Sequence, residues 1–261
     1  MSQIRELQLQ RLELKYLVNE SVAHGVRSFV SSYLDLDQFS ENKPNLSYPV
    51  HSLYLDSDSL ALYRQTMQND PNRIKLRLRY YANGSESPVF LEIKRKSNAT
   101  VFKQRVSVRR EAIGRILNGE LPAREQMREN QPGALVAAQQ FNRLLVAYDC
   151  RPRAHVCFLR EAWVHRENNS VRVTLDRSVQ CEPQLDGVCS TALDNPATVF
   201  GNRVVLELKF VGRYPDWFGE LVRAFGLTQV SAAKYAAGVT LMGEENFRRR
   251  YLARPQWQAT A

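Results

Sequence analysis

Charged side chains recur at every second position in several segments of this 261-residue chain, the spacing that places them on one face of a β-strand. Guanidinium and ammonium groups bind the non-bridging oxygens of phosphates, while carboxylate oxygens bind hard cations such as Mg²⁺ or Mn²⁺. The charged members of these segments include Glu13, Lys15, Lys75, Arg77, Arg79, Glu92, Lys94, Lys103, Arg105, Glu207 and Lys209. Together they predict a site for a phosphate-rich ligand that is accompanied by a divalent metal.

The composition agrees with an anionic partner, because 36 Lys and Arg outnumber 27 Asp and Glu and give a formal net charge of +9. Carboxylates among the cations would reduce the repulsion inside such a site and supply oxygen ligands to a metal. Glu13, Glu92 and Glu207 are the candidate metal ligands. Nucleic acid is disfavoured as a partner, because the basic segments lack a stacking pattern and their glutamates would repel a phosphate backbone.

These residues need a sheet to position them, and the hydrophobic periodicity predicts one together with several helices. Strands are expected over residues 9–16, 74–81, 89–96, 103–109, 155–165, 170–176 and 203–210. Helices are expected over residues 21–34, 59–67, 216–225 and 232–242, with two more in residues 111–145, broken near 131–133. Nothing in the sequence marks a domain boundary, so residues 1–261 are predicted to form one domain.

Two architectures fit strands that are charged on one face and apolar on the other. An open sheet could show its charged face to solvent, or the sheet could close into a barrel with the charges inside. The predicted helices need an apolar surface to pack on, which favours the closed barrel with helices outside.

The segment Arg11-Leu12-Glu13-Leu14-Lys15-Tyr16 resembles the opening of the VTC domain, the polyphosphate polymerase domain within the triphosphate tunnel metalloenzymes, or CYTH-like superfamily. The likeness continues in the family's order along the chain. It runs through Ser52–Asp56, Lys75–Tyr80, Leu91–Lys94, Arg172–Arg177, Leu206–Phe210 and Ala233–Tyr235.

The resemblance implies an α+β fold, a closed antiparallel tunnel of eight strands with helices packed outside and a C-terminal helix near one mouth. It implies transfer of the γ-phosphoryl group of ATP to a growing polyphosphate chain, with Mn²⁺ or Mg²⁺ as cofactor. Glu207 matches the family's metal-binding glutamate. Residues that match positions binding triphosphate or polyphosphate are Lys15, Arg77, Arg79, Lys94, Lys103, Arg160, Arg172 and Lys234.

We therefore predict a catalytic set and a wider binding set. The catalytic set is Lys15, Arg77, Arg79, Lys94, Arg172 and Lys234; the binding set adds Lys103, Arg105, Arg160 and Lys209. Two positions depart from the family pattern: Phe158 stands where a tyrosine is common, and Ala233 replaces a serine before Lys234. Simple alternation also places Arg160 on the face of Val156 and Phe158, so its position in the tunnel depends on the local geometry of that strand.

Two other functions stay open. A hydrolase would use the same tunnel with water as the acceptor, and a binding protein for polyphosphate or nucleic acid would need no catalysis. The resemblance to the VTC opening favours the polymerase.

The chain has no apolar N-terminal core and no apolar run near 18 residues, so a cytoplasmic location is expected. Its four cysteines lack zinc-site spacing, which is typical of reduced structural thiols. The SPX domain and membrane helices that accompany the eukaryotic enzyme are not found in this sequence. The resemblance is therefore to a free-standing bacterial form, and a separate membrane protein is a candidate partner.

Overall fold

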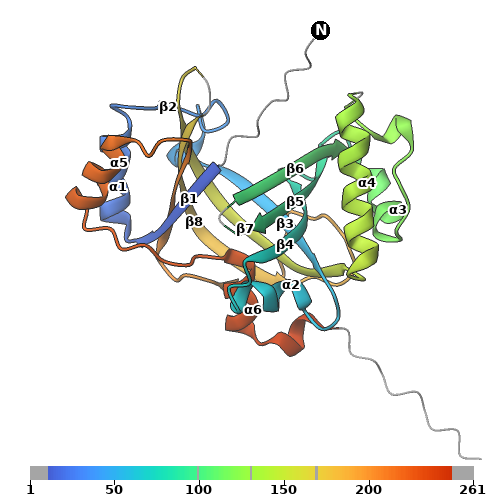
Figure 1. Cartoon of the computed structure of the whole chain (residues 1–261). Helices are drawn as coiled ribbons and strands as arrows, with labels where there is room; N and C mark the ends of the chain where they lie inside the picture. Colours follow the sequence, from blue (N-terminus) through green and yellow to red (C-terminus); the bar gives the residue numbers. More distant parts are fainter. Residues whose placement is uncertain (1–10, 99, 130, 168–169, 249–261) are drawn as a thin grey trace, which may run out of the picture.

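The computed structural model describes residues 11–98, 100–129, 131–167 and 170–248, apart from the side chain of Arg11, and it is built around one antiparallel sheet (Figure 1). The strands follow the order β1-β10-β8-β7-β3-β4-β5-β6, with two short strands, β2 (Asp35–Leu36) and β9 (Ala197–Thr198), paired to β7 and β8. The long strands are β1 (Arg11–Val18), β3 (Tyr48–Asp56), β4 (Asn72–Tyr80), β5 (Val89–Ser97), β6 (Thr100–Val108), β7 (Arg151–Val164), β8 (Val171–Pro183) and β10 (Val204–Val211).

The prediction of a closed eight-stranded tunnel is wrong in two respects. The sheet has ten strands, and in the described part of the chain its end strands β1 and β6 are not paired to each other. The free edge of β1 is occupied instead by a later segment, since Tyr16 forms a bridge with Gln229 and the Val230 amide donates to the Lys15 carbonyl at 2.9 Å. Side chains span the seam as well, because Lys94 on β5 is 2.8 Å from Glu13 on β1.

The predicted packing of helices on the apolar face of the sheet is present in two places (Figure 1). Helices α3 (Ile113–Leu117) and α4 (Pro132–Ala147) cover the apolar sides of β4, β5 and β6, where Leu76 and Leu78 are fully buried. Helices α1 (Glu20–Val30) and α5 (Asp216–Ala224) cover β1, β10 and β8. Burial of this kind is the main driving force for the fold, at about 1.5–3 kcal/mol for each large apolar side chain.

The third apolar cluster differs, because it lies at one end of the charged face. Helix α6 (Lys234–Met242) and helix α2 (Ala61–Met67) pack there against β3, β7 and β8. The Tyr235 ring stacks on Tyr54 at a centroid distance of 4.7 Å. This contact fixes the first turn of α6 beside the charged side chains and so determines where Lys234 lies.

Most predicted elements are found with shifts at their ends, one predicted helix is much shorter than expected, and one strand was not predicted. The first helix expected after residue 111 ends at Leu117, and residues 118–131 carry only a 3₁₀ turn, Arg124–Gln126. Strand β3 was not predicted, because residues 50–56 are buried on both faces and show no alternation of polar and apolar types. The beginning of the strand expected at residue 9 lies outside the described residues. All four cysteines are buried and free.

Among the described residues there is no helix with the length and apolar character needed to span a membrane.

Candidate functional site

The charged face of the sheet lines a cavity of about 790 Å³. Alternation along each strand directs the charged side chains into it, as the sequence predicts. The predicted residues that line it are Glu13, Lys15, Arg77, Arg79, Lys94, Lys103, Arg105, Arg160, Arg172, Glu207, Lys209 and Lys234. Glu92, the remaining predicted residue, is buried against four of these cations. The structure thus brings the whole predicted set together, while their roles as ligands stay predictions.

One group of charges surrounds Glu92, and we call it the Glu92 cluster: Glu92, Arg77, Arg79, Lys103 and Arg105. Arg77 Nη2 is 2.6 Å from Glu92 Oε2, and Lys103 Nζ is 3.0 Å from Oε1. The guanidiniums of Arg79 and Arg105 approach the same carboxylate at 3.8 and 3.6 Å. Burial raises the pKa of Glu92, but these cations outweigh burial and hold the pKa well below its usual range. Glu92 is therefore a permanent anion that holds several cations in place.

A second group, the Glu207 cluster, consists of Glu13, Glu207, Asp176, Lys15, Arg160, Lys209 and Lys234. Lys15 and Lys234 both lie 3.1 Å from Glu207 Oε1, and Lys209 lies 2.5 Å from Oε2. Burial raises the pKa of Glu207, but the lysines outweigh that effect and bring it well below the usual range. For Lys209, burial is the largest effect and lowers its pKa to about 8, although Glu207 opposes the change.

Strand register explains why the members of the Glu207 cluster meet. Lys15 on β1 is directly opposite Glu207 on β10, which is opposite Thr174 on β8. Asp176, two residues along β8, pairs with Arg160 on β7 and accepts two hydrogen bonds of 2.7 Å from its guanidinium. The register between neighbouring strands therefore brings cationic and anionic side chains together in one part of the cavity.

Asp176 was missed as a site residue, although it belongs to a segment that resembles the family. It is fully buried, and Lys234 Nζ lies 2.7 Å from its carboxylate. The signal available in the sequence was an acidic residue that directly follows the apolar Leu175 within a predicted strand, residues 170–176. Buried acids of this type are paired with cations, which is its role here.

The alternation in β7 proves compatible with the assignment of Arg160. Phe158 and Arg160 both line the cavity, so the face they share is the interior one. The irregularity between β7 and β8 falls at Cys157/Leu159. The Phe158 ring lies 5.0 Å from the Arg160 guanidinium and 4.8 Å from Lys234 Nζ, both within the range of cation–π contacts. Where the family commonly has a hydroxyl, this chain has an aromatic face between two cations.

Several other cavity residues were not predicted as ligands. Lys75, which alternation places beside Arg77, lines the cavity without a carboxylate at ion-pair distance among the described residues. Burial, followed by the repulsion of Lys15 and Lys94, brings its pKa well below the usual range. Tyr54, on the unpredicted strand β3, accepts a 3.0 Å hydrogen bond from Arg77.

Arg172, a member of the predicted set, differs from the other cations of that set because its partner lies outside both clusters. Its guanidinium is 2.7 Å from the Asp37 carboxylate.

The described residues contain no group of three or more His, Cys, Asp or Glu side chains arranged to hold a metal ion. The carboxylates of both clusters are engaged by lysine and arginine instead. Any metal in this cavity would thus have to take most of its oxygens from the ligand, as Mg²⁺ commonly does with phosphates.

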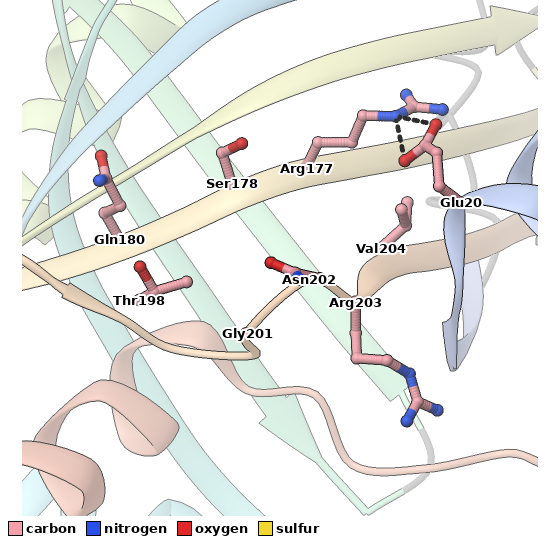
Figure 2. Close-up of a pocket in the computed structure, with 9 residues that line it drawn as sticks. All are labelled: Glu20, Arg177, Ser178, Gln180, Thr198, Gly201, Asn202, Arg203 and Val204. Atoms are coloured by element: carbon pink, nitrogen blue, oxygen red, sulfur yellow. Dashed lines mark hydrogen bonds and ion pairs between the residues drawn. The ribbon is translucent and has the colours of Figure 1, made fainter.

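A second hollow of about 420 Å³ lies beside α1, between β8 and the segment before β10 (Figure 2). Its buried cation, Arg177, is already neutralised, since Nε is 2.8 Å from Glu20 and Nη1 is 2.8 Å from Glu161. This hollow therefore lacks the excess of cations that distinguishes the larger cavity.

No curated protein matches the chain. Among solved structures, a match is the crystal structure of a Bacillus halodurans protein provisionally named an adenylate cyclase. It is 13% identical, with a TM-score of 0.47 over 86% of this chain and 94% of that one. The sequence profile of the VTC domain matches residues 10–243. The chain therefore belongs to the VTC domain family, and its function is related to triphosphate or polyphosphate.

Proposed function

We propose that this protein transfers the γ-phosphoryl group of ATP to a polyphosphate chain inside the 790 Å³ cavity. The observation that carries the proposal is the Glu92 cluster. Four cations share one carboxylate there, a formal charge of +4 − 1 = +3 on side chains that belong to three adjacent strands. An excess of fixed cations in a cavity is stabilised by a polyanion of similar charge density.

Phosphoryl transfer depends mainly on positioning and on neutralising the charge of the phosphates. The guanidiniums of Arg77 and Arg79 are held by Glu92, and Tyr54 orients Arg77 further, so both groups are fixed before a ligand arrives. Lys15, Lys209 and Lys234 contact Glu207 and can turn from its carboxylate to phosphate oxygens. These groups would bind the donor phosphates and screen their repulsion from an incoming phosphate.

A divalent metal, Mn²⁺ or Mg²⁺, belongs to this proposal. Glu207 is the best candidate ligand because it lines the cavity. Glu13 also lines the cavity, and Lys15 forms ion pairs with both carboxylates. Glu92 fits a metal less well, since it does not line the cavity and is 1% exposed. When bound, the metal would polarise phosphate oxygens that share it with the carboxylate.

The test is incubation of the purified protein with ATP and Mn²⁺. A ladder of polyphosphate supports the polymerase, released phosphate without a ladder supports a hydrolase, and binding without turnover supports a non-catalytic protein. Glu207→Gln should abolish metal-dependent turnover, because the amide removes the charge that a hard cation needs. Triphosphate should still bind to this variant.

A matched control is Glu86→Gln, since the Glu86 side chain is 83% exposed and lies outside the cavity. Full activity of Glu207→Gln would show that Glu207 is not a metal ligand.

A further inference from the structure

The two ends of the cavity differ in chemistry. Tyr48 begins β3, Tyr81 follows the end of β4, and Phe90 is near the start of β5. The pairings His51↔Tyr80 and Arg79↔Phe90 place these rings at the same end of the sheet. We call the group Phe39, Tyr48, Tyr81 and Phe90 the aromatic mouth.

The opposite end of the same strands is basic. There Arg73 is paired with Lys96 and Lys75 with Lys94, one residue and three residues after the start of β4 at Asn72. We call Arg73, Lys75 and Lys96 the basic mouth; all three line the cavity. No ion pair joins them to a carboxylate within the described residues, so this end attracts phosphates and offers no ring to a base.

The aromatic mouth presents a continuous run of rings from the cavity to solvent. Tyr48 and Tyr81 line the cavity with centroids 6.2 Å apart. Phe39 lies 6.2 Å from Tyr48 and is 61% exposed, so its ring is open to solvent at this end. Phe90 lies 6.0 Å from Tyr81 and carries the Arg105 guanidinium 3.5 Å above its ring.

We infer that the cavity binds a nucleoside triphosphate in one direction, with its base against the aromatic mouth and its phosphates pointing toward Lys75 and the basic mouth. This inference rests on the proposed function and adds the position of the base and the route of the polyphosphate. Aromatic rings stack on any base, because every base has a π-face. Arg105 belongs to the Glu92 cluster and contacts Phe90 of the aromatic mouth, so base and phosphates would lie on adjacent groups.

The test compares ATP with inorganic triphosphate, which has the phosphates but no base. We expect Phe39→Ala and Tyr81→Leu to weaken ATP binding about tenfold, the typical effect of losing one stacking ring. Triphosphate binding should change less than about twofold, since neither ring carries a charge. GTP should behave as ATP does. Phe102→Ala is the matched control, because Phe102 is 40% exposed and alternates with the cavity residues Val101 and Lys103.

Equal losses for ATP and triphosphate, or no loss for ATP, would overturn the inference and leave the proposed function standing. Failure of the unmodified protein to bind either ligand would overturn both.

The direction of the phosphates is tested separately by a substitution in the basic mouth. Lys96→Gln should weaken the binding of long polyphosphate several-fold and leave ATP unchanged, with Arg95→Gln on the exposed side of β5 as control. If Lys96→Gln left the binding of long polyphosphate unchanged, the phosphates would not run toward the basic mouth and the direction would be overturned. An equal loss for ATP would show that the triphosphate itself reaches Lys96, which agrees with the direction.

Discussion

The Glu92 cluster and the Glu207 cluster use the same residue types but differ in charge balance. Around Glu92, four cations face one carboxylate. Around Glu207, the cations Lys15, Arg160, Lys209 and Lys234 face the carboxylates of Glu13, Asp176 and Glu207, a formal charge of +4 − 3 = +1. The Glu92 cluster therefore carries a large excess of positive charge, whereas the Glu207 cluster is almost neutral without a ligand.

This difference assigns different tasks to two sides of one cavity, the side of β4, β5 and β6 and the side of β1, β10, β8 and β7. A cluster of charge +3 gains most from a bound polyanion, because each cation is repelled by the others until phosphates arrive. A nearly neutral cluster gains less from phosphate alone, but its carboxylates can accept a cation that arrives with the phosphates. Lys94 joins the two, since it is paired with Glu13 and opposite both Lys75 and Lys103 in the sheet.

The largest effect should follow from Glu92→Gln. Removal of one partner from a buried ion pair costs about 3–5 kcal/mol, because the remaining charges are left uncompensated. The melting temperature should fall by roughly 6–20 °C in a chain of this size. Saturating triphosphate should then raise the melting temperature of the variant by more than it raises that of the unmodified protein. Scanning calorimetry with and without triphosphate measures this, with Glu86→Gln as the exposed control. Equal ligand effects on both proteins would contradict a cluster poised for a polyanion.

Arg77→Gln should have the next largest effect, on affinity. A hydrogen bond to a charged group contributes about 1.5–3 kcal/mol, so the affinity for triphosphate should fall roughly 10- to 150-fold. Titration calorimetry of this variant beside Arg95→Gln separates the loss of a cavity cation from a change in net charge. An equal effect of the two substitutions would place the ligand outside the Glu92 cluster.

The Glu207 cluster should make the affinity for triphosphate depend on pH. Burial lowers the pKa of Lys209 to about 8, so in the empty cavity its ammonium is fully charged below that pH and is lost as the pH rises through it. A bound phosphate favours the charged form and raises this pKa. Lys209 should therefore contribute a fall in affinity of about tenfold between pH 7 and pH 9. Lys103, whose pKa burial lowers to about 7 although Glu92 opposes the change, adds a fall that begins at lower pH. In Lys209→Arg the guanidinium stays charged, and the part of the fall centred near pH 8 should disappear. An unchanged pH profile in that variant would show that another group controls binding.

Much of this comparison could be predicted from the sequence, because period-two alternation determines the face of a strand. It placed Arg77, Arg79, Lys94 and Glu207 on one surface, and the structure shows them around one cavity. The charge balance could not be predicted in the same way, because ion pairs depend on register between strands far apart in the chain. Lys15 and Glu207 are opposite each other across β1 and β10, which alternation within either strand cannot reveal.

The seam between β1 and β6 was beyond prediction for a similar reason. Whether a sheet closes depends on strand tilt and stagger around its whole circumference. Here the edge of β1 is taken by Gln229 and Val230, from a segment without any strand signal in the sequence. Strand β3 was missed because residues buried on both faces do not alternate. The roles of the cavity residues, the metal and the single domain remain predictions.

The smallest effect concerns Phe158, which faces the Glu207 cluster from β7. Its ring contacts Arg160 and Lys234, so it already stabilises two cations without a hydroxyl. Phe158→Tyr would add a donor directed into the cavity, and a single net hydrogen bond contributes about 0.5–1.5 kcal/mol. Triphosphate affinity should therefore increase roughly threefold, within a range of about 2- to 12-fold, while the ring keeps its cation–π contacts. Phe158→Leu should instead weaken binding, because it removes the ring that holds both cations. The two substitutions separate the hydroxyl from the ring: a gain in Phe158→Tyr with no loss in Phe158→Leu would show that the cations are held by Asp176 and Glu207 alone.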